Sequence, residues 1–411
     1  MSRILLAWEL GLNLGHLGRL LPVAVRLKER GHAVLAAVRD VPAAASVFGP
    51  VGVSFVAAPY FPQGIALGRQ PSGYADILLS QGWSDRNALW GLVHAWCNLF
   101  RLFQPDIVVL DYAPTARLAA RIMGLPVVMI GNGFELPPTS APLPAFPGYG
   151  PALQQQAEAS EALALDSAGV VCAAYQVAPL AALRELFEVE ACLLATFQEL
   201  DHYSARGTGR YVGPLLGKMP CEKIEWPPGN GQRIFACVRP DTQNVDMILN
   251  ALAANGAAVV CFAPGFKAER LAPFQERIRF SAKPLDLQYL TDADVCVSYG
   301  AEGTVAHFLL AGVPQLLAPH YVEAQAAAKR IEEWGAGLVL RGAQTVESVG
   351  ICLNRLIADT HYKLRALAFS DQYRGFDAER GADAVTDVVE GVLLSCAGRR
   401  DMPNDSARSA I

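Results

Sequence analysis

Short apolar runs alternate along the chain with longer stretches in which apolar residues recur at helical spacing. Such runs are typical of strands buried on both faces of a sheet, and the stretches between them are typical of amphipathic helices. The first example is a strand at residues 3–8, a helix at 16–30 that Gly31 ends, and a strand at 33–38. This alternation predicts a doubly wound α/β sheet. Further strands are expected at residues 53–57, 107–110, 127–130, 169–172 and 192–195.

A second series of apolar runs follows a polar, proline-rich stretch at residues 217–231. Its strands are expected at residues 233–238, 257–262, 277–281, 295–298, 315–318 and 337–340. Two of these strands lead through the turns 299–304 and 319–323 into helices. Turns at the carboxyl ends of parallel strands hold ligands, and helix N-termini favour anions, so this stretch predicts a nucleotide-sugar site.

Two segments depart from the alternation. Residues 60–101 are rich in aromatic side chains, which either line a pocket for a bulky, partly apolar substrate or pack an ordinary helical excursion onto the sheet. Residues 131–151 are rich in proline, so we expect a long surface loop or a flexible lid. A helical stretch at residues 346–394, with a break near Gly375, is expected to close the fold.

Composition narrows the class of protein. The 411 residues exceed what one hydrophobic core usually serves, so two domains are expected. A net charge of -5 without any Lys/Arg run argues against a nucleic-acid partner. The nine cysteines are dispersed with no CxxC, which predicts reduced core thiols in a cytoplasmic protein. No run is apolar and long enough to span a bilayer, and the N-terminus has the pattern of a strand rather than of a signal peptide.

Three segments together resemble one known family. They are GHLGRLLPVAVRLKERGHAV near the start, YVGPLL in the middle, and YGAEGTVAHFLLAGVPQLLAPHYVEAQ in the second half. They are similar to GT-B glycosyltransferases of the UDP-glycosyltransferase family, which includes bacterial macrolide and flavonoid transferases. The resemblance implies an α/β protein with two doubly wound Rossmann-like domains facing each other across a cleft. The acceptor-binding domain would span 1–216 and the nucleotide-sugar-binding domain 217–398, with the terminal helix returning to the first domain and a disordered tail at 399–411.

The activity implied by the resemblance is inverting transfer of a sugar from a UDP- or dTDP-sugar to a hydroxyl of a small, partly apolar acceptor. In such enzymes a histidine at the place of His16 is the base, and an aspartate at the place of Asp111 orients it. The residues alone support the pair, because both lie at the carboxyl ends of strands in one predicted sheet. An orienting carboxylate fixes the imidazole tautomer and stabilises the imidazolium. The alternatives are that His16 caps a helix at a glycine turn and that Asp111 caps the helix from Ala113.

The resemblance also implies where the donor binds. The cradle for the diphosphate falls on Gly300, Ala301, Gly303 and Thr304, and the carboxylate for the sugar hydroxyls falls on Glu323. Small residues let backbone N–H groups approach a phosphate, and the threonine adds a hydroxyl donor at the start of a helix. A carboxylate that only accepts hydrogen bonds suits a ring of sugar hydroxyls.

The sequence departs from the family pattern at several donor positions. Tyr299 stands where the family has a histidine, and Ala324 stands where it has a glutamine, with Gln325 one residue later. His307 occupies a position that is often acidic in plant members and used on the ribose. We expect Arg239, at the end of the first strand of the second domain, to bind the diphosphate with Tyr299 in place of the missing histidine. Alternatively, Tyr299 packs as a core ring and Arg239 is solvated.

Acceptor-binding candidates are Glu9, Trp83, Trp90 and Phe134, although Glu9 could simply be solvated. The expected partners are a nucleotide-sugar donor and a small or lipid-like acceptor, with no transmembrane segment and peripheral membrane contact left open. No cofactor is expected besides the co-substrate, and the histidines show no metal-ligand spacing. Two alternative functions remain open: a GT-B epimerase or phosphorylase, or a non-catalytic partner protein with the same fold.

Overall fold

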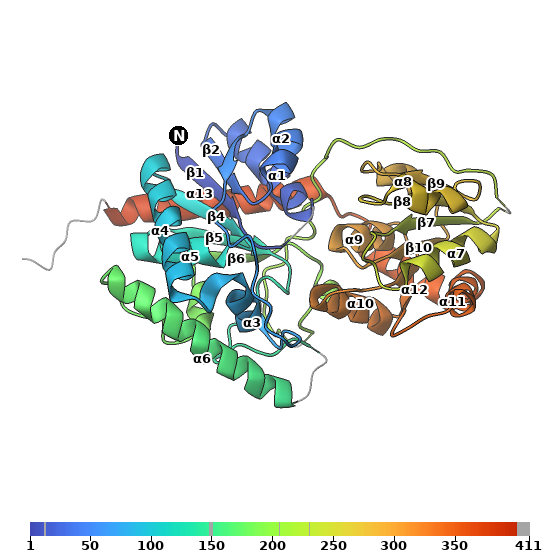
Figure 1. The fold of residues 1–411 in the computed structure, drawn as a ribbon. Helices are drawn as coiled ribbons and strands as arrows, with labels where there is room; N and C mark the ends of the chain where they lie inside the picture. Colours follow the sequence, from blue (N-terminus) through green and yellow to red (C-terminus); the bar gives the residue numbers. More distant parts are fainter. Residues whose placement is uncertain (12–13, 148–150, 205, 230, 401–411) are drawn as a thin grey trace, which may run out of the picture. The chain divides into compact units, whose positions relative to one another are not determined.

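The computed structural model describes residues 1–11, 14–147, 151–204, 206–229 and 231–400, which form two compact units (Figure 1). Unit 1 contains Met1–Phe197, residues 206–218 and the chain from Asp377, and unit 2 contains Gln198–Ser204 and Met219–Phe376. Relative to the expected ranges, a short segment after Phe197 belongs to unit 2 and the last helix belongs to unit 1. That helix reaches Arg400, and the rest of the expected tail lies outside the described residues.

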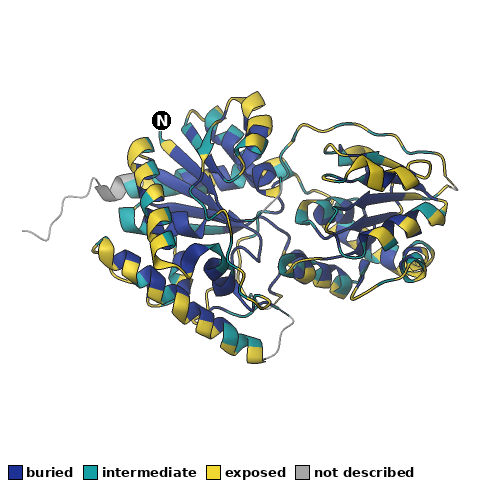
Figure 2. Ribbon diagram, viewed as in Figure 1, coloured by how far each residue is buried: buried dark blue, intermediate teal, exposed yellow. Residues whose placement is uncertain are grey.

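Unit 1 is built on a parallel sheet of six strands in the order β3-β2-β1-β4-β5-β6. The strands are β1 (Arg3–Trp8), β2 (Ala33–Val38), β3 (Ser54–Ala57), β4 (Ile107–Asp111), β5 (Val127–Gly131) and β6 (Ala191–Leu194). The α-helices are α1 (Gly15–Glu29), α2 (Val41–Phe48), α3 (Tyr74–Leu78), α4 (Arg86–Phe103), α5 (Pro114–Met123), α6 (Pro151–Ala174) and α13 (Ala378–Arg400). Short helical turns are η1 (Gly49–Val51), η2 (Leu79–Trp83) and η3 (Leu183–Phe187). The central strands are buried on both faces because helices cover both sides of the sheet (Figure 2).

Helix α13 packs beside α1 within unit 1. Arg26 of α1 contacts Asp383 at 2.7 Å, and Arg30 contacts Glu390 at 2.7 Å. Because surface ion pairs contribute little individually, the apolar face of α13, including Val385 and Val389, supplies the main attachment.

One strand predicted from the sequence is wrong. Residues 169–172 lie inside α6, where Val171 and Cys172 are buried while Val170 is largely exposed. A short apolar run has the same composition in a buried strand and on the inner face of a helix, so periodicity alone does not separate them.

The aromatic segment at residues 60–101 forms a helical excursion made of α3, η2 and α4. The rings of Tyr74, Trp83, Trp96 and Phe100 are almost fully buried. This burial favours packing of the excursion over an exposed aromatic wall.

The proline-rich segment after β5 is irregular, as expected, but its first part is not a surface loop. Residues 131–137 are all buried, and Phe134 and Leu136 anchor them in the core of unit 1. Residues 148–150 of the expected lid lie outside the described part of the chain. The loop is therefore part of the structure that surrounds the end of β5.

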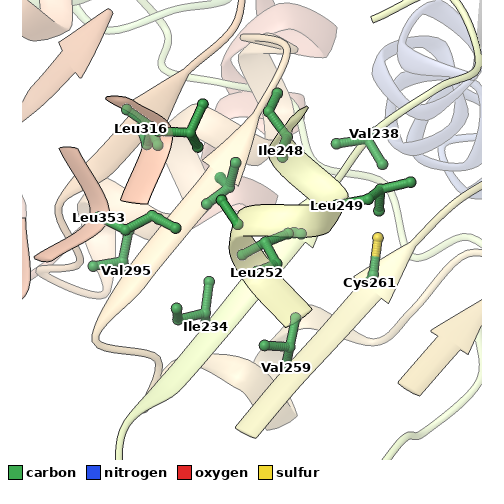
Figure 3. Close-up of a cluster of buried hydrophobic side chains, with 14 of the residues drawn as sticks. Ile234, Val238, Ile248, Leu249, Leu252, Val259, Cys261, Val295, Leu316 and Leu353 are labelled. Carbon is green, nitrogen blue, oxygen red and sulfur yellow. The ribbon is translucent and has the colours of Figure 1, made fainter. Parts of the chain in front are cut away.

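Unit 2 contains a second parallel sheet of six strands, in the order β12-β11-β10-β7-β8-β9. Its strands are β7 (Arg233–Cys237), β8 (Ala258–Phe262), β9 (Ile278–Ser281), β10 (Val295–Ser298), β11 (Gln315–Leu317) and β12 (Gly337–Val339). Its α-helices are α7 (Val245–Asn255), α8 (Ala268–Leu271), α9 (Glu302–Leu310), α10 (Val322–Trp334), α11 (Val346–Ala358) and α12 (Thr360–Gln372). Short turns are η4 (Gln198–Leu200), η5 (Ala272–Phe274) and η6 (Leu287–Leu290). Figure 3 shows the core, in which Ile248 and Leu252 of α7 pack against Ile234, Val259 and Val295 of the sheet.

The two sheets have the same strand order when unit 2 is read from its β9 edge. In each sheet the first strand of the unit lies in the middle. The next two strands lie on one side of it, and the last three strands lie on the other side. The order reverses between β1 and β4 in unit 1 and between β7 and β10 in unit 2. Open α/β sheets bind ligands at the carboxyl ends of the strands flanking this reversal. Among the described residues, no helix has the length and apolar character needed to cross a membrane.

Candidate active site

His16 and Asp111 meet at the strand-order reversal of unit 1. Asp111 ends β4, directly beside Trp8 of β1, and His16 is the second residue of α1. The His16 Nδ1 atom lies 3.2 Å from both carboxylate oxygens of Asp111. Asp111 is fully buried and His16 is 8% exposed. The structure thus brings together the two residues that the sequence analysis paired, with the geometry of a carboxylate that orients an imidazole.

Two aromatic rings fix the plane of the imidazole. The His16 ring stacks on Trp8 at 5.1 Å between centroids and on Tyr112 at 6.1 Å. Tyr112 has a left-handed backbone (φ 49°), a strained conformation for a bulky residue, and its carbonyl accepts the Leu10 N–H at 3.0 Å. That bond ties the ends of β1 and β4 together. A Cβ added to Gly11 would lie 2.2 Å from His16 Nε2, and the backbone there has φ 80°, so the position needs a glycine.

Two further charged residues, which sequence analysis missed, complete the cluster. Arg19 follows His16 by three residues on α1, and its Nη1–H donates to Asp111 Oδ1 at 2.5 Å and to Glu135 Oε2 at 2.5 Å. The same Glu135 oxygen accepts the backbone N–H of Asn132 at 2.7 Å. Glu135 Oε1 lies 3.8 Å from His16 Nδ1. We call His16, Arg19, Asp111 and Glu135 the charge quartet, and all four are buried.

The quartet shifts the proton affinities of its members. Burial lowers the pKa of His16, but the charge and hydrogen bond of Asp111, helped by Glu135, outweigh burial, so the net pKa is raised. Burial raises the pKa of Asp111, but the charges of Arg19 and His16 outweigh it and the net pKa is lowered. The ligand atoms of His16, Asp111 and Glu135 lie within 4.8 Å of one another, close enough to share a metal ion. The Arg19 guanidinium instead supplies a positive charge between the two carboxylates.

Glu9 has a role different from both alternatives considered for it. Its side chain accepts the backbone N–H groups of Thr115 at 2.8 Å and Ala116 at 3.1 Å, so it caps the N-terminus of α5. It is buried rather than solvated, and both oxygens bind α5 rather than pointing to an acceptor. This arrangement also excludes Asp111 as the cap of α5. Burial raises the pKa of Glu9 to about 7 despite these hydrogen bonds.

The other acceptor-binding candidates lie in different environments. Trp83 is fully buried, and its indole N–H donates to Thr115 Oγ1 at 3.1 Å, so it exposes no surface to a ligand. Trp90 is 45% exposed on α4, where it stacks on His94. Phe134 alone joins the rings beside the quartet, with its centroid 6.4 Å from that of Tyr112.

In unit 2, the turn after β10 leads into α9 through Gly300 and Ala301. Gly300 has φ 91°, and a Cβ there would lie 3.4 Å from the Ala324 carbonyl oxygen, so the turn packs closely on the start of α10. Ala301 is the N-cap of α9 and makes no side-chain cap hydrogen bond. Gly303 is exposed and Thr304 is half-buried in the first turn of α9. The helix therefore begins at the reversal of strand order with small residues around its first N–H groups, an arrangement suited to phosphate.

Arg239 and Tyr299 follow the two paired strands β7 and β10, so they lie at the same reversal point. Burial raises the pKa of Tyr299, and the positive charge of Arg239 acts in the opposite direction. Tyr321, missed by sequence analysis, lies with its ring 6.5 Å from that of Tyr299. Arg239 Nε lies 3.5 Å from Asp241 Oδ1. The cluster joins two phenols and a partly exposed guanidinium beside the start of α9.

Among the remaining donor candidates, His307 is bound to the backbone, whereas Glu323 and Gln325 lie in the first turn of α10. The His307 ring lies with Nε2 3.0 Å from the Leu287 carbonyl oxygen, and burial lowers its pKa, so it donates to the backbone of η6 as a neutral imidazole. This contact occupies one nitrogen of the residue that stands at the family's ribose position. Glu323 is half-buried in the first turn of α10, and Gln325 is exposed. Ala324 between them is buried beneath Gly300.

Two doubly wound sheets of the same order, each with polar side chains at its reversal point, define the GT-B fold expected from the sequence. Residues 246–375 match the family described as "Erythromycin biosynthesis protein CIII-like, C-terminal domain". Comparison with curated proteins gives no match.

Solved structures similar to nearly the whole chain confirm the fold. The calicheamicin glycosyltransferase CalG4 has a TM-score of 0.72 at 20% identity, over 96% of this chain and 99% of that chain. The glycosyltransferase VinC, in complex with dTDP, has a TM-score of 0.67 at 18% identity, over 97% and 100%. Spinosyn rhamnosyltransferase SpnG, complexed with thymidine diphosphate, has a TM-score of 0.68 at 18% identity, over 95% and 100%. The chain thus has the GT-B fold of these glycosyltransferases, and residues 246–375 match the erythromycin biosynthesis protein CIII-like C-terminal domain.

Proposed function

We propose that the protein is an inverting glycosyltransferase that moves a sugar from a dTDP- or UDP-sugar to a hydroxyl of a small, partly apolar acceptor. The observation that carries the proposal is the buried His16–Asp111 pair at the reversal point of unit 1. Supporting it, VinC and SpnG have the same fold and are complexed with dTDP and thymidine diphosphate. The intact pair also favours an enzyme over a non-catalytic partner protein.

His16 acts as the general base in this proposal. Asp111 accepts the Nδ1–H, so the lone pair of the neutral imidazole is on Nε2. Nε2 takes the proton of the acceptor hydroxyl while the hydroxyl oxygen attacks the anomeric carbon of the donor sugar. The bond from that carbon to the diphosphate oxygen breaks as the new bond forms, and a single displacement inverts the configuration.

Unit 2 binds the donor in this proposal. The N–H groups at the start of α9, the Thr304 hydroxyl and the Arg239 guanidinium bind the diphosphate as it gathers negative charge. Glu323 accepts hydrogen bonds from the sugar hydroxyls. Because these groups supply the stabilisation, the reaction needs no metal ion, and the rate should be unchanged by EDTA.

A ligand screen and a mutant together test the function. UDP-, dTDP- and GDP-glucose should be compared by thermal shift, since a ligand that binds the folded state raises the melting temperature with its occupancy. The binding donor should then be incubated with phenolic and macrolide acceptors, and products followed by mass spectrometry. We expect a glycosylated product with the wild type, and donor binding without product for His16→Ala. No shift with any nucleotide sugar, or equal product from both proteins, would refute the proposal.

A further inference from the structure

The charge quartet encloses one guanidinium between two carboxylates that come from different elements. Asp111 ends β4, and Glu135 belongs to the buried loop after β5. A single nitrogen of Arg19 lies 2.5 Å from an oxygen of each. His16 Nδ1 lies 3.2 Å from Asp111 and 3.8 Å from Glu135, so the imidazole faces both carboxylates.

Two carboxylates this close and this deeply buried do not both ionise without a compensating positive charge. Asp111 must be ionised to stabilise the imidazolium that forms when His16 takes a proton. Arg19 is permanently charged and supplies that compensation. The role that the His16–Asp111 pair plays therefore depends on a residue one helical turn away from His16.

We propose that Arg19 and Glu135 are positioning residues whose opposite charges, together with Asp111, decide the pH at which His16 becomes a neutral base. The consequence for catalysis rests on the proposed function, because it requires His16 to take the acceptor proton. The consequence for the protonation of His16 itself does not depend on that function.

Formal charges give the direction of each effect. With His16 neutral, the quartet carries one net negative charge, and with His16 protonated it is neutral. Without the charge of Glu135, the quartet is already neutral when His16 is neutral. Protonation of His16 is then less favourable than in the wild type. Removing the charge of Arg19 leaves two negative charges, so protonation is favoured. Removing both charges restores the wild-type balance.

The other groups that face the imidazole do not change this reasoning. Trp8 of β1 carries no charge, and Tyr112 after β4 stacks on the ring face. The charged groups acting on His16 are Asp111, Glu135 and Arg19. Among the described residues, these are therefore the charges to vary.

The direct test follows the protonation of His16 by NMR in the full-length protein with isotope-labelled histidine. The His16 signal is assigned by its loss in His16→Gln. Glu135→Gln should lower the midpoint of the His16 titration by about one pH unit or more, and Arg19→Gln should raise it by a similar amount. The double variant should return the midpoint close to the wild-type value. Arg26→Gln, which removes a partly exposed arginine from the same helix, should leave it unchanged.

A structural role alone would not move the midpoint in opposite directions or restore it in the double variant. Unchanged midpoints, or shifts of the same sign in the two single variants, would overturn the proposal. If Arg19→Gln does not fold, the proposal is still tested by the lowered midpoint of Glu135→Gln and the restored midpoint of the double variant. Arg19→Lys, which keeps the charge, should keep a midpoint near that of the wild type.

The reaction gives a second readout. The acidic limb of the pH–rate profile should move to lower pH in Glu135→Gln and to higher pH in Arg19→Gln, in step with the NMR midpoints. NMR midpoints that move as expected in a protein without transferase activity would refute the proposed function and leave the role of the quartet intact. Rates that shift without any movement of the NMR midpoints would refute the role of the quartet.

Discussion

Replacing Asp111 by asparagine keeps the size of the side chain and removes its charge. Arg19 donates to Asp111 Oδ1 at 2.5 Å, so the asparagine oxygen should turn toward that guanidinium. Its NH₂ group then faces His16 Nδ1, where the wild type has the second carboxylate oxygen at 3.2 Å. A donor at this place favours the imidazole tautomer with the proton on Nε2. That tautomer cannot accept a proton from the acceptor hydroxyl.

The size of the effect follows from the contact that is lost. A hydrogen bond to a charged group contributes about 1.5–3 kcal/mol. At about 1.36 kcal/mol per tenfold in rate, losing it lowers the rate by roughly 10- to 150-fold. The change of tautomer lowers it further, so we expect a loss of at least about tenfold. Nucleotide binding should remain near the wild-type value, because the change lies in unit 1 and the proposed donor-binding residues lie in unit 2.

The assay compares hydrolysis or transfer of the bound nucleotide sugar in four proteins: wild type, Asp111→Asn, His16→Ala and the double variant. Asp111 acts only through His16, so Asp111→Asn should have no further effect in the His16→Ala background. Breaking a buried charge pair costs about 3–5 kcal/mol of stability, so each variant must first be shown to be folded at the assay temperature. A rate within about threefold of wild type, or an equal loss in both backgrounds, would mean that Asp111 does not orient the base.

Three further changes test other parts of the structure. Glu9→Gln should remove a pH dependence of stability. The folded-state pKa of Glu9, about 7, lies above its ordinary value of 4.5, so the wild type loses up to about 3 kcal/mol as pH rises through this window. The difference in melting temperature between variant and wild type should therefore grow from pH 4.5 to 7, and a constant difference would contradict the shift. Gly11→Ala should displace the His16 imidazole, the proposed base, and lower transfer at least about tenfold, whereas Gly15→Ala, with no atom within 4 Å of the new Cβ, should not. Equal rates in these two variants would contradict the close approach. Arg239→Met should weaken dTDP or UDP binding by about 1.5–3 kcal/mol and leave the nucleoside unaffected in calorimetric titration. Arg270→Met, at a similar side-chain exposure of 38% against 37%, should change neither, and unchanged diphosphate affinity in Arg239→Met would exclude the proposed contact.

Most of the fold could be predicted because parallel strands buried on both faces have a strong apolar signal. Strands such as Val295–Ser298 stand out between turns and polar helix faces. The miss at residues 169–172 has the opposite cause, since a buried stripe on a long helix produces the same short run of valines. The loop after β5 was misjudged because proline predicts irregular backbone but does not predict burial. Four apolar residues, including Phe134 and Phe146, bury much of that loop.

The site was predictable only where chain order places residues at strand ends. His16 and Asp111 each follow a strand, so their proximity followed from a parallel sheet. Arg19 offered a weaker signal, because it lies three residues after His16 and so on the same helix face, in an otherwise apolar run. Glu135 offered none, since its position depends on how an irregular loop folds. Glu9 follows a strand as well, yet its function as the cap of α5 depends on a helix start far along the chain.

The two reversal points place similar backbone geometry around different side chains, and the difference corresponds to two kinds of chemistry. In unit 1 the ionisable groups are buried and paired, which makes each proton affinity sensitive to its neighbours. A base that must accept and later release a proton needs that sensitivity. In unit 2, Ala301 and Thr304 at the start of α9 are half-buried and Gly303 is exposed, and Arg239 after β7 is partly exposed. A diphosphate needs N–H donors and a permanent charge that it can reach, and it needs no tuned proton affinity. Exchanging these environments would impair both sites. A diphosphate would bring uncompensated charge into the buried site, and an exposed histidine would lose the carboxylates that set its protonation. Under the proposed function, the same strand order can therefore serve both substrates of a transferase, because burial at the strand ends, rather than topology, decides which chemistry each sheet supports.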